Sequence, residues 1–287
     1  MIRRPPRSTQ SRSSAASDVY KRQMFGPALG GLMGGWFGWE ANFWLIGGLG
    51  VVILVIAYFD QGETVPENTL GFREQFTEYP ELLTSRRFWG YCLASAFGAG
   101  AFFAYLGGGP FVGSIVYNLS PEMLGLYFGA PAIGYFLGNF LSGRYTTRFG
   151  IDAMILWGLW IIFFGLSLSM IFSHLGYGSV ETFFGFMILV GLGNGLSIPN
   201  STAGMLSVRP HLAGTASGLG GAMMIAIGAA LSTLAGAFLV PGSNEMPLLL
   251  LMWVSSLSGV GVILYAVSYT HLRAHETPEH LVCRLLL

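Results

Sequence analysis

Residues 88–106, FWGYCLASAFGAGAFFAYL, form an apolar run that contains no Asp, Glu, Lys or Arg. Five further runs of this kind follow before residue 268, and each holds 19 to 29 residues. They are Met123–Ser142, Ala153–Phe172, Thr182–Asn200, Leu212–Val240 and Pro247–Val267. A helix of about 20 apolar residues crosses the hydrocarbon core of a bilayer. Six such runs in succession therefore predict a bundle of membrane-spanning helices.

The composition of the chain also indicates a lipid environment. Of its 287 residues, 53% are hydrophobic and only 10% are charged, whereas a soluble domain carries about 25% charged residues. The 42 glycines agree with this, because glycine is more frequent in transmembrane helices than in soluble ones. The two cysteines, Cys92 and Cys283, provide neither a disulfide framework nor a set of metal ligands. The predicted fold class is an all-α polytopic membrane protein.

The arginines predict how the helices are threaded through the membrane. Residues 24–267 contain six basic residues, all Arg, and each lies in a polar joint between apolar runs. Cytoplasmic joints of membrane proteins collect Arg and Lys. If the joint 60–87 is cytoplasmic and the sides then alternate, every arginine is cytoplasmic. The charged residues of the external joints are then all acidic. The arginines are Arg73, Arg86, Arg87, Arg144, Arg148 and Arg209, and the external acidic residues are Glu40, Glu122, Glu181 and Glu245.

The polar joints also predict the domain organisation. Residues 24–59 are interpreted as the end of an N-terminal membrane half, in which 24–37 is too short to span a bilayer and reads as a truncated helix. Residues 60–87, with six acidic residues and three arginines, are interpreted as a cytoplasmic linker between two halves. Residues 88–267 then form a C-terminal half of six helices.

The two ends of the chain differ from this core. Residues 1–23 contain six basic residues and no apolar run, so they lack the h-region of a signal peptide. Their Arg- and Ser-rich composition also suits an organellar transit peptide. Residues 268–287 carry three histidines within ten residues, at 271, 275 and 280. Both ends are interpreted as non-native, adapter-like sequence that flanks a gene fragment.

Three short motifs stand out within the core. Residues 26–31, GPALGG, are similar to the end of an antiporter motif, G-x3-G-P-x2-G-G. Residues 143–150, GRYTTRFG, are similar to a loop motif, G-x3-D-[RK]-x-G-[RK]-[RK], although Thr147 replaces its Asp and Ile151-Asp152 replace its final basic pair. Residues 198–200, IPN, followed by 213–217, AGTAS, form the third. Together the motifs resemble the major facilitator superfamily, and within it the drug:proton antiporters of the bicyclomycin/chloramphenicol-resistance (Bcr/CflA) type.

The resemblance covers about residues 24–267 and implies about eight helices, equivalent to helices 5–12 of twelve. It implies a secondary active transporter that exports small amphipathic drugs or xenobiotics by alternating access, driven by proton entry. An importer of a small nutrient such as a sugar, purine or organic acid is the alternative, and a nonfunctional fragment of a carrier is a third interpretation. No nucleophile–base constellation or nucleotide loop is visible, so no enzyme activity is predicted.

The same resemblance implies the partners and the location of the chain. The partners are the lipid bilayer, protons and a small-molecule substrate, with no nucleic acid, and the chain is expected to be a monomer. No cofactor or metal is implied, because a proton gradient is the driving force. The implied location is the inner (plasma) membrane of a bacterium, which the protein crosses several times.

Two motif-based sets of residues are predicted to control helix packing and the cytoplasmic gate. The first set consists of small residues that let helices approach closely, namely Gly26, Pro27, Gly30 and Gly31. The second set lies in the loop motif, namely Gly143, Arg144, Arg148 and Gly150. Its arginines either latch the gate or only anchor the topology.

Four further residues are candidates for a substrate cavity, namely Phe102, Tyr105, Asn139 and Asn194. Aromatic rings at span ends also serve as packing or interface anchors, and Asn side chains, including that of Asn200, also link helices in lipid. Residues 191–195, GLGNG, are interpreted as a site of close helix packing or local unwinding.

No ionisable residue lies inside the six runs, so the proton-carrying carboxylate is expected in the first half of the carrier. Three acidic residues, Glu122, Asp152 and Glu181, lie at predicted helix ends instead. There they are expected to be solvated, and the helix dipole favours them.

Overall fold

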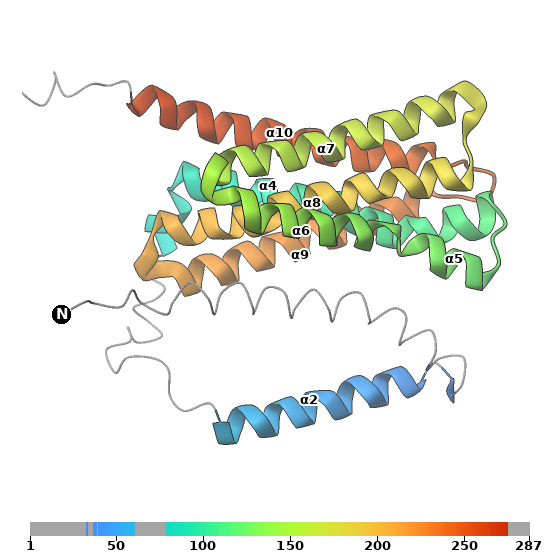
Figure 1. The fold of residues 1–287 in the computed structure, drawn as a ribbon, viewed down its shortest axis with the longest axis horizontal. Coiled ribbons are helices and arrows are strands. Elements are labelled where there is room, and N and C mark those ends of the chain that lie inside the picture. The colour runs from blue at the N-terminus through green and yellow to red at the C-terminus, as the bar shows by residue number, and fades with distance from the viewer. Residues whose placement is uncertain (1–32, 34–36, 39, 61–78, 275–287) are drawn as a thin grey trace, which may run out of the picture. The chain divides into compact units, whose positions relative to one another are not determined.

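The computed structural model describes residues 33, 37–38, 40–60 and 79–274, with side chains described to residue 266. The chain divides into two compact units, residues 1–76 and 77–287. In the first unit the described helix is α2 (Glu40–Asp60), which is long and apolar enough to span a membrane (Figure 1). The predicted short segment 24–37 and the motif residues 26–31 lie outside the described residues, apart from residues 33 and 37.

The second unit contains the predicted succession of long helices. In chain order they are α4 (Arg86–Phe111), α5 (Pro121–Phe128), α6 (Ala130–Phe149), α7 (Ile151–Phe172), α8 (Val180–Val208), α9 (Ala213–Phe238) and α10 (Met246–Ala274). Short π-helical turns extend α4 over Val112–Val116 and α7 over Ser173–Tyr177, and a 3-10 turn, Pro210–Leu212, precedes α9. Counted with these turns, and with α5–α6 as one span, the described residues hold seven candidate membrane spans. The all-α polytopic fold is confirmed.

Serine side chains fix where three of these helices begin. Ser85 accepts a hydrogen bond from Phe88 N, and Ser120 accepts one from Met123 N. Ser179 and Thr182 form a reciprocal capping box, in which each side chain accepts from the other residue's backbone N–H. These bonds satisfy N–H groups that have no partner within a helix, which matters most where no water is present.

The first of the six runs is predicted to end at residue 106, and this end is wrong. Helix α4 continues through the sequence GGGP at 107–110 to Phe111. The glycines serve packing instead, because a Cβ at Gly107 would collide with Ser232 of α9, and one at Gly108 would lie 2.8 Å from Leu248 of α10. Ser114 Oγ donates 2.7 Å to the carbonyl oxygen of Pro110, four residues earlier.

Two further joints are shorter than predicted. The expected joint 143–152 reduces to Gly150, whose φ of +83° lets the chain turn directly from α6 into α7. The expected joint 201–211 is helical to Val208. Some polar side chains of these stretches have partners on the helices: Thr146 bonds Asn200, and Thr202 bonds the carbonyl oxygen of Ile198.

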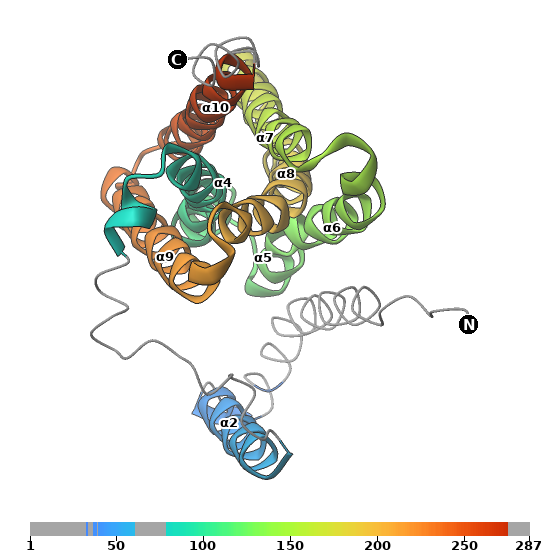
Figure 2. The ribbon, with the colours of Figure 1, turned by 90° about the vertical axis from the view of Figure 1, so that its left-hand side faces the viewer.

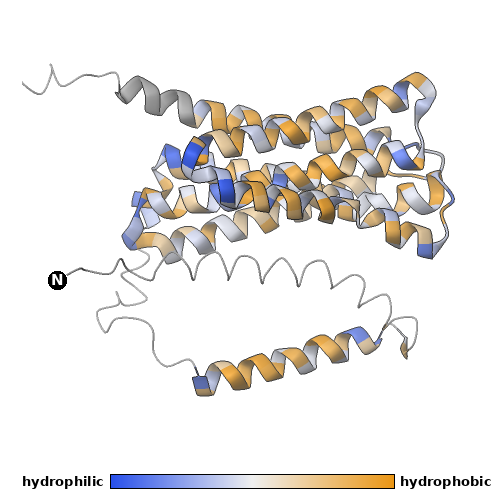
Figure 3. Ribbon diagram, in the orientation of Figure 1, coloured by the Kyte–Doolittle hydropathy of each residue, from blue (hydrophilic) through white to orange (hydrophobic). Residues whose placement is uncertain are grey.

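The helices α4 and α8 lie at the centre of the second unit, with α6, α7, α9 and α10 packed around them (Figure 2). Figure 3 shows hydrophobic residues along the middle of these helices and hydrophilic residues gathered toward their ends. Within the window of each span, about half the residues of α4 and α8 are buried, against 11% for α9. The candidate site described below is therefore built on the two central helices, α4 and α8.

Candidate substrate pocket

The glycine-rich sequence 191–195 in the middle of α8 packs against two helices at once. A Cβ at Gly191 would collide with the carbonyl oxygen of Pro131, and one at Gly195 would lie 2.5 Å from that of Tyr135, both on α6. Gly193 faces the other way, and a Cβ there would collide with the carbonyl oxygen of Gly158 on α7. Helix α8 is continuous through this stretch, so the structure shows close packing rather than local unwinding.

One turn further toward the C-terminal end of α8, Asn200 joins α8 to α6. Its Nδ2 donates 2.8 Å to Ser142 Oγ and 2.7 Å to Leu196 O, and its Oδ1 accepts 2.9 Å from Thr146 Oγ1. The side chain is 3% exposed, and both of its polar ends are satisfied. Asn200 therefore has the helix-linking role that the sequence left open for it.

Three other polar side chains of α8 are buried without partners among the described residues. Asn194 is 3% exposed, and neither its Oδ1 nor its Nδ2 has a hydrogen bond. The hydroxyls of Ser197 and Ser201 are also fully buried and unpartnered. Burying such a group unpaired costs about 1–3 kcal/mol. This stripe of α8 is therefore the most unfavourable polar surface inside the unit.

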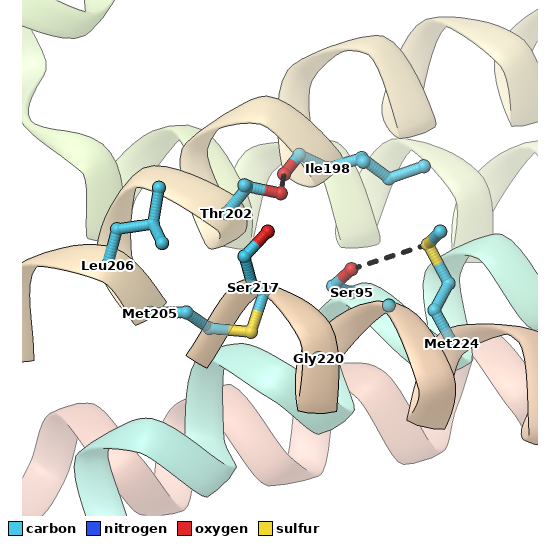
Figure 4. Close-up of a pocket in the computed structure, with 9 residues that line it drawn as sticks. Ser95, Ile198, Thr202, Met205, Leu206, Ser217, Gly220 and Met224 are labelled. Carbon is cyan, nitrogen blue, oxygen red and sulfur yellow. Dashed lines mark hydrogen bonds between the residues drawn. The ribbon is translucent and has the colours of Figure 1, made fainter. Parts of the chain in front are cut away.

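A pocket of about 140 Å³ lies beside this stripe, between α4, α8 and α9 (Figure 4). Its polar lining consists of hydroxyl groups, from Ser95, Thr202 and Ser217, and the rest is apolar. The other lining residues are Ile198, Met205, Leu206, Gly220, Gly221 and Met224. No charged residue lines it.

Ser95 of α4 is the most deeply placed of the three hydroxyls, at 2% exposed. Its hydroxyl points toward Met224 and donates to the thioether sulfur at 3.8 Å (Figure 4). A thioether is only a weak acceptor. A ligand oxygen that replaced it would therefore gain a better hydrogen bond.

The pocket is too small to enclose a drug-sized molecule by itself. Ligand pockets typically have volumes of about 300–1,000 Å³, so a site of about 140 Å³ accommodates only part of such a molecule. Its flexible methionines fit varied apolar shapes, because the Met side chain is unbranched and polarizable. The pocket is therefore small, and its lining combines hydroxyl groups with methionine and other apolar surface.

The sequence analysis did not identify this pocket. Its α9 wall consists of Ser217, Gly220, Gly221 and Met224, which recur at intervals of three and four residues and so share one helix face. That periodicity was a usable signal. What it could not reveal is that α4 and α8 present Ser95 and Thr202 to the same space.

Of the four residues predicted for the cavity, none lines this pocket. Tyr105 is fully buried, its ring stacks on Phe128 at 4.8 Å, and its hydroxyl donates 3.0 Å to Phe128 O. Phe102 stacks beside it, with ring centroids 6.3 Å apart. Asn139 donates 2.8 Å to Tyr135 O on its own helix. Asn194 alone of the four lies near the pocket with free polar atoms.

At the end of the unit where α4 and α7 begin, a chain of polar contacts joins these two helices. Arg87 Nε donates 3.3 Å to Tyr91 Oη, and Tyr91 Oη donates 2.6 Å to Asp152 Oδ1. Tyr91 is 2% exposed, and its ring also fills the space opposite Gly204 of α8. Asp152 was expected to be only solvated, and the structure shows instead that it anchors a buried tyrosine.

The predicted loop motif lies at the same end and is exposed. Gly150 ends α6 with its positive φ, as a glycine in a tight turn can. Arg148 lies over the ring of Phe149, with Cζ 5.3 Å from the ring centroid. Neither Arg144 nor Arg148 forms an ion pair with another of the described residues. Gly143 has open space around its Cα.

The described end of the predicted linker, residues 79–83, belongs to the second unit and packs against its helices. Residues 79–83 are helical, and Leu82 among them is fully buried. Glu81 forms an ion pair with Arg209, and one of its oxygens lies 3.6 Å from His211 Nε2. Trp89 Nε1 donates 2.7 Å to Leu83 O. The linker therefore contacts the connection between α8 and α9, next to the pocket walls.

Glu245 lies at the opposite end and is 7% exposed. Among the described residues it is the charged residue that is buried. Its Oε1 accepts a 2.6 Å hydrogen bond from Ser173 Oγ, which ties the loop before α10 to the end of α7. Burial raises the pKa of the nearby Tyr117 phenol above its ordinary value, and the charge of Glu245 acts in the same direction. This cluster lies at the end of the unit where α7 ends and α10 begins.

These features define the class of the protein: a polytopic helical membrane protein whose central helices line a small pocket, with no charged residue among the described residues that line it. The sequence pattern of the Major Facilitator Superfamily matches residues 23–233. The chain belongs to that superfamily of transporters.

Three curated relatives match much of the chain. The "Bicyclomycin resistance protein homolog" of Haemophilus influenzae is 28% identical over 72% of this chain and 53% of its own length. The "Chloramphenicol resistance protein" of Pseudomonas aeruginosa is 29% identical over 71% of this chain and 49% of its own length. The "Uncharacterized MFS-type transporter YdgK" of Bacillus subtilis is 26% identical over 77% and 55%. The chain spans about half the length of these relatives, and the two named for resistance support the Bcr/CflA resemblance.

Proposed function

We propose that the chain is the C-terminal part of a carrier that exports small uncharged or amphipathic drugs from a bacterial cell. The observation that carries this proposal is the pocket between α4, α8 and α9, which has hydroxyl and methionine walls and no charged lining. The resistance proteins among its relatives support the direction of transport. A carrier of this kind works by alternating access about a site between two halves.

The small volume of the pocket agrees with a site that two halves share. The second wall would come from the part of the relatives' length that this chain does not cover. The coupling carboxylate would come from there too, because the interiors of the described spans contain no acidic residue. The 287-residue chain by itself is then expected to give no substrate flux.

The experiment is an efflux assay with the chain extended at its N-terminal side to the length of its relatives. Chloramphenicol retention is measured in cells that express this carrier in the plasma membrane, before and after a protonophore dissipates the proton gradient. The expected result is lower retention that the protonophore reverses, with no effect from an empty vector. Uptake of a nutrient without efflux of the drug would contradict the proposal and favour an importer.

The exposed loop motif is proposed to act in the cytoplasmic gate. Its support is geometric: Gly150 sets a fixed turn, and the two arginines are available to a partner across the gate. Exchange of both arginines, R144Q with R148Q, is expected to slow transport with normal insertion of the protein. A carrier that inserts with altered sidedness but transports normally once inserted would reduce their role to anchoring.

A further inference from the structure

The unpartnered side chain of Asn194 lies at the middle of α8 and calls for an explanation. Both of its amide atoms are buried, and neither has a hydrogen-bond partner among the described residues. Ser197 and Ser201 follow at three and seven residues, so their buried and equally unpartnered hydroxyls share its face of the helix. Buried polar groups in native proteins are normally paired, and three on one stripe point to a partner that is not a fixed part of the fold.

Asn194 points toward α4 at a position where α4 has no side chain. A Cβ at Gly98 would lie 3.1 Å from Asn194 Oδ1 and 3.5 Å from Ser197 Oγ. The amide therefore occupies its place only because residue 98 is a glycine. At this level α4 and α8 approach closely, with the amide against bare backbone and Leu159 of α7 beside it.

This contact lies directly beyond the pocket. Ser95, the deepest hydroxyl of the pocket, is three residues from Gly98 on α4, and Ile198 of the pocket wall is four residues from Asn194 on α8. Residues three or four apart on a helix are neighbours on one face. The stripe that begins at Asn194 therefore continues the pocket by one turn toward the middle of the membrane.

A second asparagine on the same helix shows what a purely structural role looks like. Asn200 is buried to the same extent, at 3% exposed, and makes three hydrogen bonds, two of them to α6. Asn194 has the same chemistry and burial but none of the bonds. The difference assigns Asn194 to a ligand rather than to the scaffold.

We propose that Asn194 hydrogen-bonds the transported molecule, with Ser197 beside it, when α4 and α8 separate at Gly98 and the pocket extends to the stripe. The group it selects is an uncharged one that both donates and accepts, such as an amide or a hydroxyl, because no charged side chain lines the pocket. This inference rests on the proposed export function and names the residue that recognises the substrate.

The test has two measurements on matched variants. First, N194L and N200L are made in the 287-residue chain, and their thermal unfolding is followed in detergent. N200L is expected to lower the Tm, because it removes bonds to Ser142 and Thr146, whereas N194L leaves the Tm unchanged or raises it. Second, N194L is made in the extended carrier, and the KM and kcat for chloramphenicol, an uncharged molecule with amide and hydroxyl groups, are measured. The control is N139L, which removes only a bond within α6.

The expected transport result is a rise in KM of about tenfold or more for N194L with little change in kcat, and no change for N139L. N194S, which keeps a hydroxyl, is expected to recover part of the loss. A fall in Tm for N194L as large as that for N200L would overturn the proposal, because Asn194 would then have a structural partner. Normal KM in N194L would also overturn it while leaving the export function intact. Absence of transport by the unaltered extended carrier would overturn both.

Discussion

Helix α8 presents two very different surfaces to its neighbours. Toward α6 and α7 it meets backbone with backbone, through Gly191, Gly193 and Gly195, and Asn200 pairs both ends of its amide there. Toward α4 it presents the unpartnered Asn194 and Ser197, of which Ser197 also lies against Gly158 of α7, and toward α9 it forms the wall of a pocket. Both surfaces are buried and both contain polar residues.

The two surfaces of α8 do not differ in burial or in composition. They differ in whether their polar groups have hydrogen-bond partners within the fold. In lipid, close approach of helices supplies the stabilising contacts, because there is no hydrophobic driving force between helices. The side of α8 that is closely packed and fully bonded holds the unit together, and the side with unused hydrogen-bonding capacity is available to a substrate.

The largest expected effect tests the closely packed side. In G191A the added Cβ would meet the carbonyl oxygen of Pro131, which belongs to backbone and cannot move aside. Overpacking of this kind costs about 3 kcal/mol, so the free energy of unfolding and the yield of inserted protein are expected to fall sharply. The matched control is G185A on the same helix, where nothing lies within 4 Å. Equal stability of the two variants would show that α6 and α8 are not packed in this way.

The next effect concerns the bonded asparagine. N200A is expected to lower the free energy of unfolding by about 1–3 kcal/mol, because it removes the two bonds that join α8 to Thr146 and Ser142 and leaves those hydroxyls only their bonds within α6. Chemical unfolding in mixed micelles measures this, and a double-mutant cycle with S142A isolates the coupling, expected at about 0.6 kcal/mol or more. Zero coupling between the two residues would remove the α6–α8 link and weaken the contrast with Asn194.

A smaller effect is expected where the N-terminal ends of α4 and α7 meet. Y91F keeps the ring against Gly204 but removes the 2.6 Å bond to the Asp152 carboxylate. Hydrogen bonds to charged groups contribute about 1.5 kcal/mol at the lower end of their range, and unfolding experiments are expected to show a loss of that order. The control is Y127F, whose hydroxyl makes a longer, exposed contact of 3.4 Å with Glu181. Similar behaviour of the two variants would indicate that water replaces the Tyr91 bond.

The smallest effect is expected where the linker contacts the connection between α8 and α9. E81Q breaks an ion pair with Arg209 in which both side chains are nearly half exposed. Such surface pairs contribute about 0–1 kcal/mol, and salt screens them. The difference in stability between E81Q and the unaltered chain is expected to be under about 0.5 kcal/mol and to vanish in high salt. A larger, salt-independent loss would mean that the linker is a structural part of the C-terminal unit.

Much of the architecture could be predicted from the sequence. Uninterrupted apolar runs predicted the spans, because a bilayer requires each spanning segment to be long, apolar and helical. The joints were the weak point. The glycines and the proline at 107–110 and the polar residues at 201–208 were read as loops, yet both stretches are helical. Their meaning depends on whether a neighbouring helix covers them, which local sequence does not reveal.

The candidate site divides in the same way. The sequence alone determined that the protein is a bundle of membrane helices, that residues 191–195 are a packing or unwinding site, and that no ionisable residue lies inside the six runs of residues 88–267. Only the tertiary structure decided that Tyr105 and Asn139 have partners within the fold, that Asn200 is bonded, and that Asn194 is not. The physical reason is that composition and periodicity fix what surrounds a helix, whereas the pairing of a hydrogen-bonding group depends on atoms that distant segments bring within about 3 Å of it.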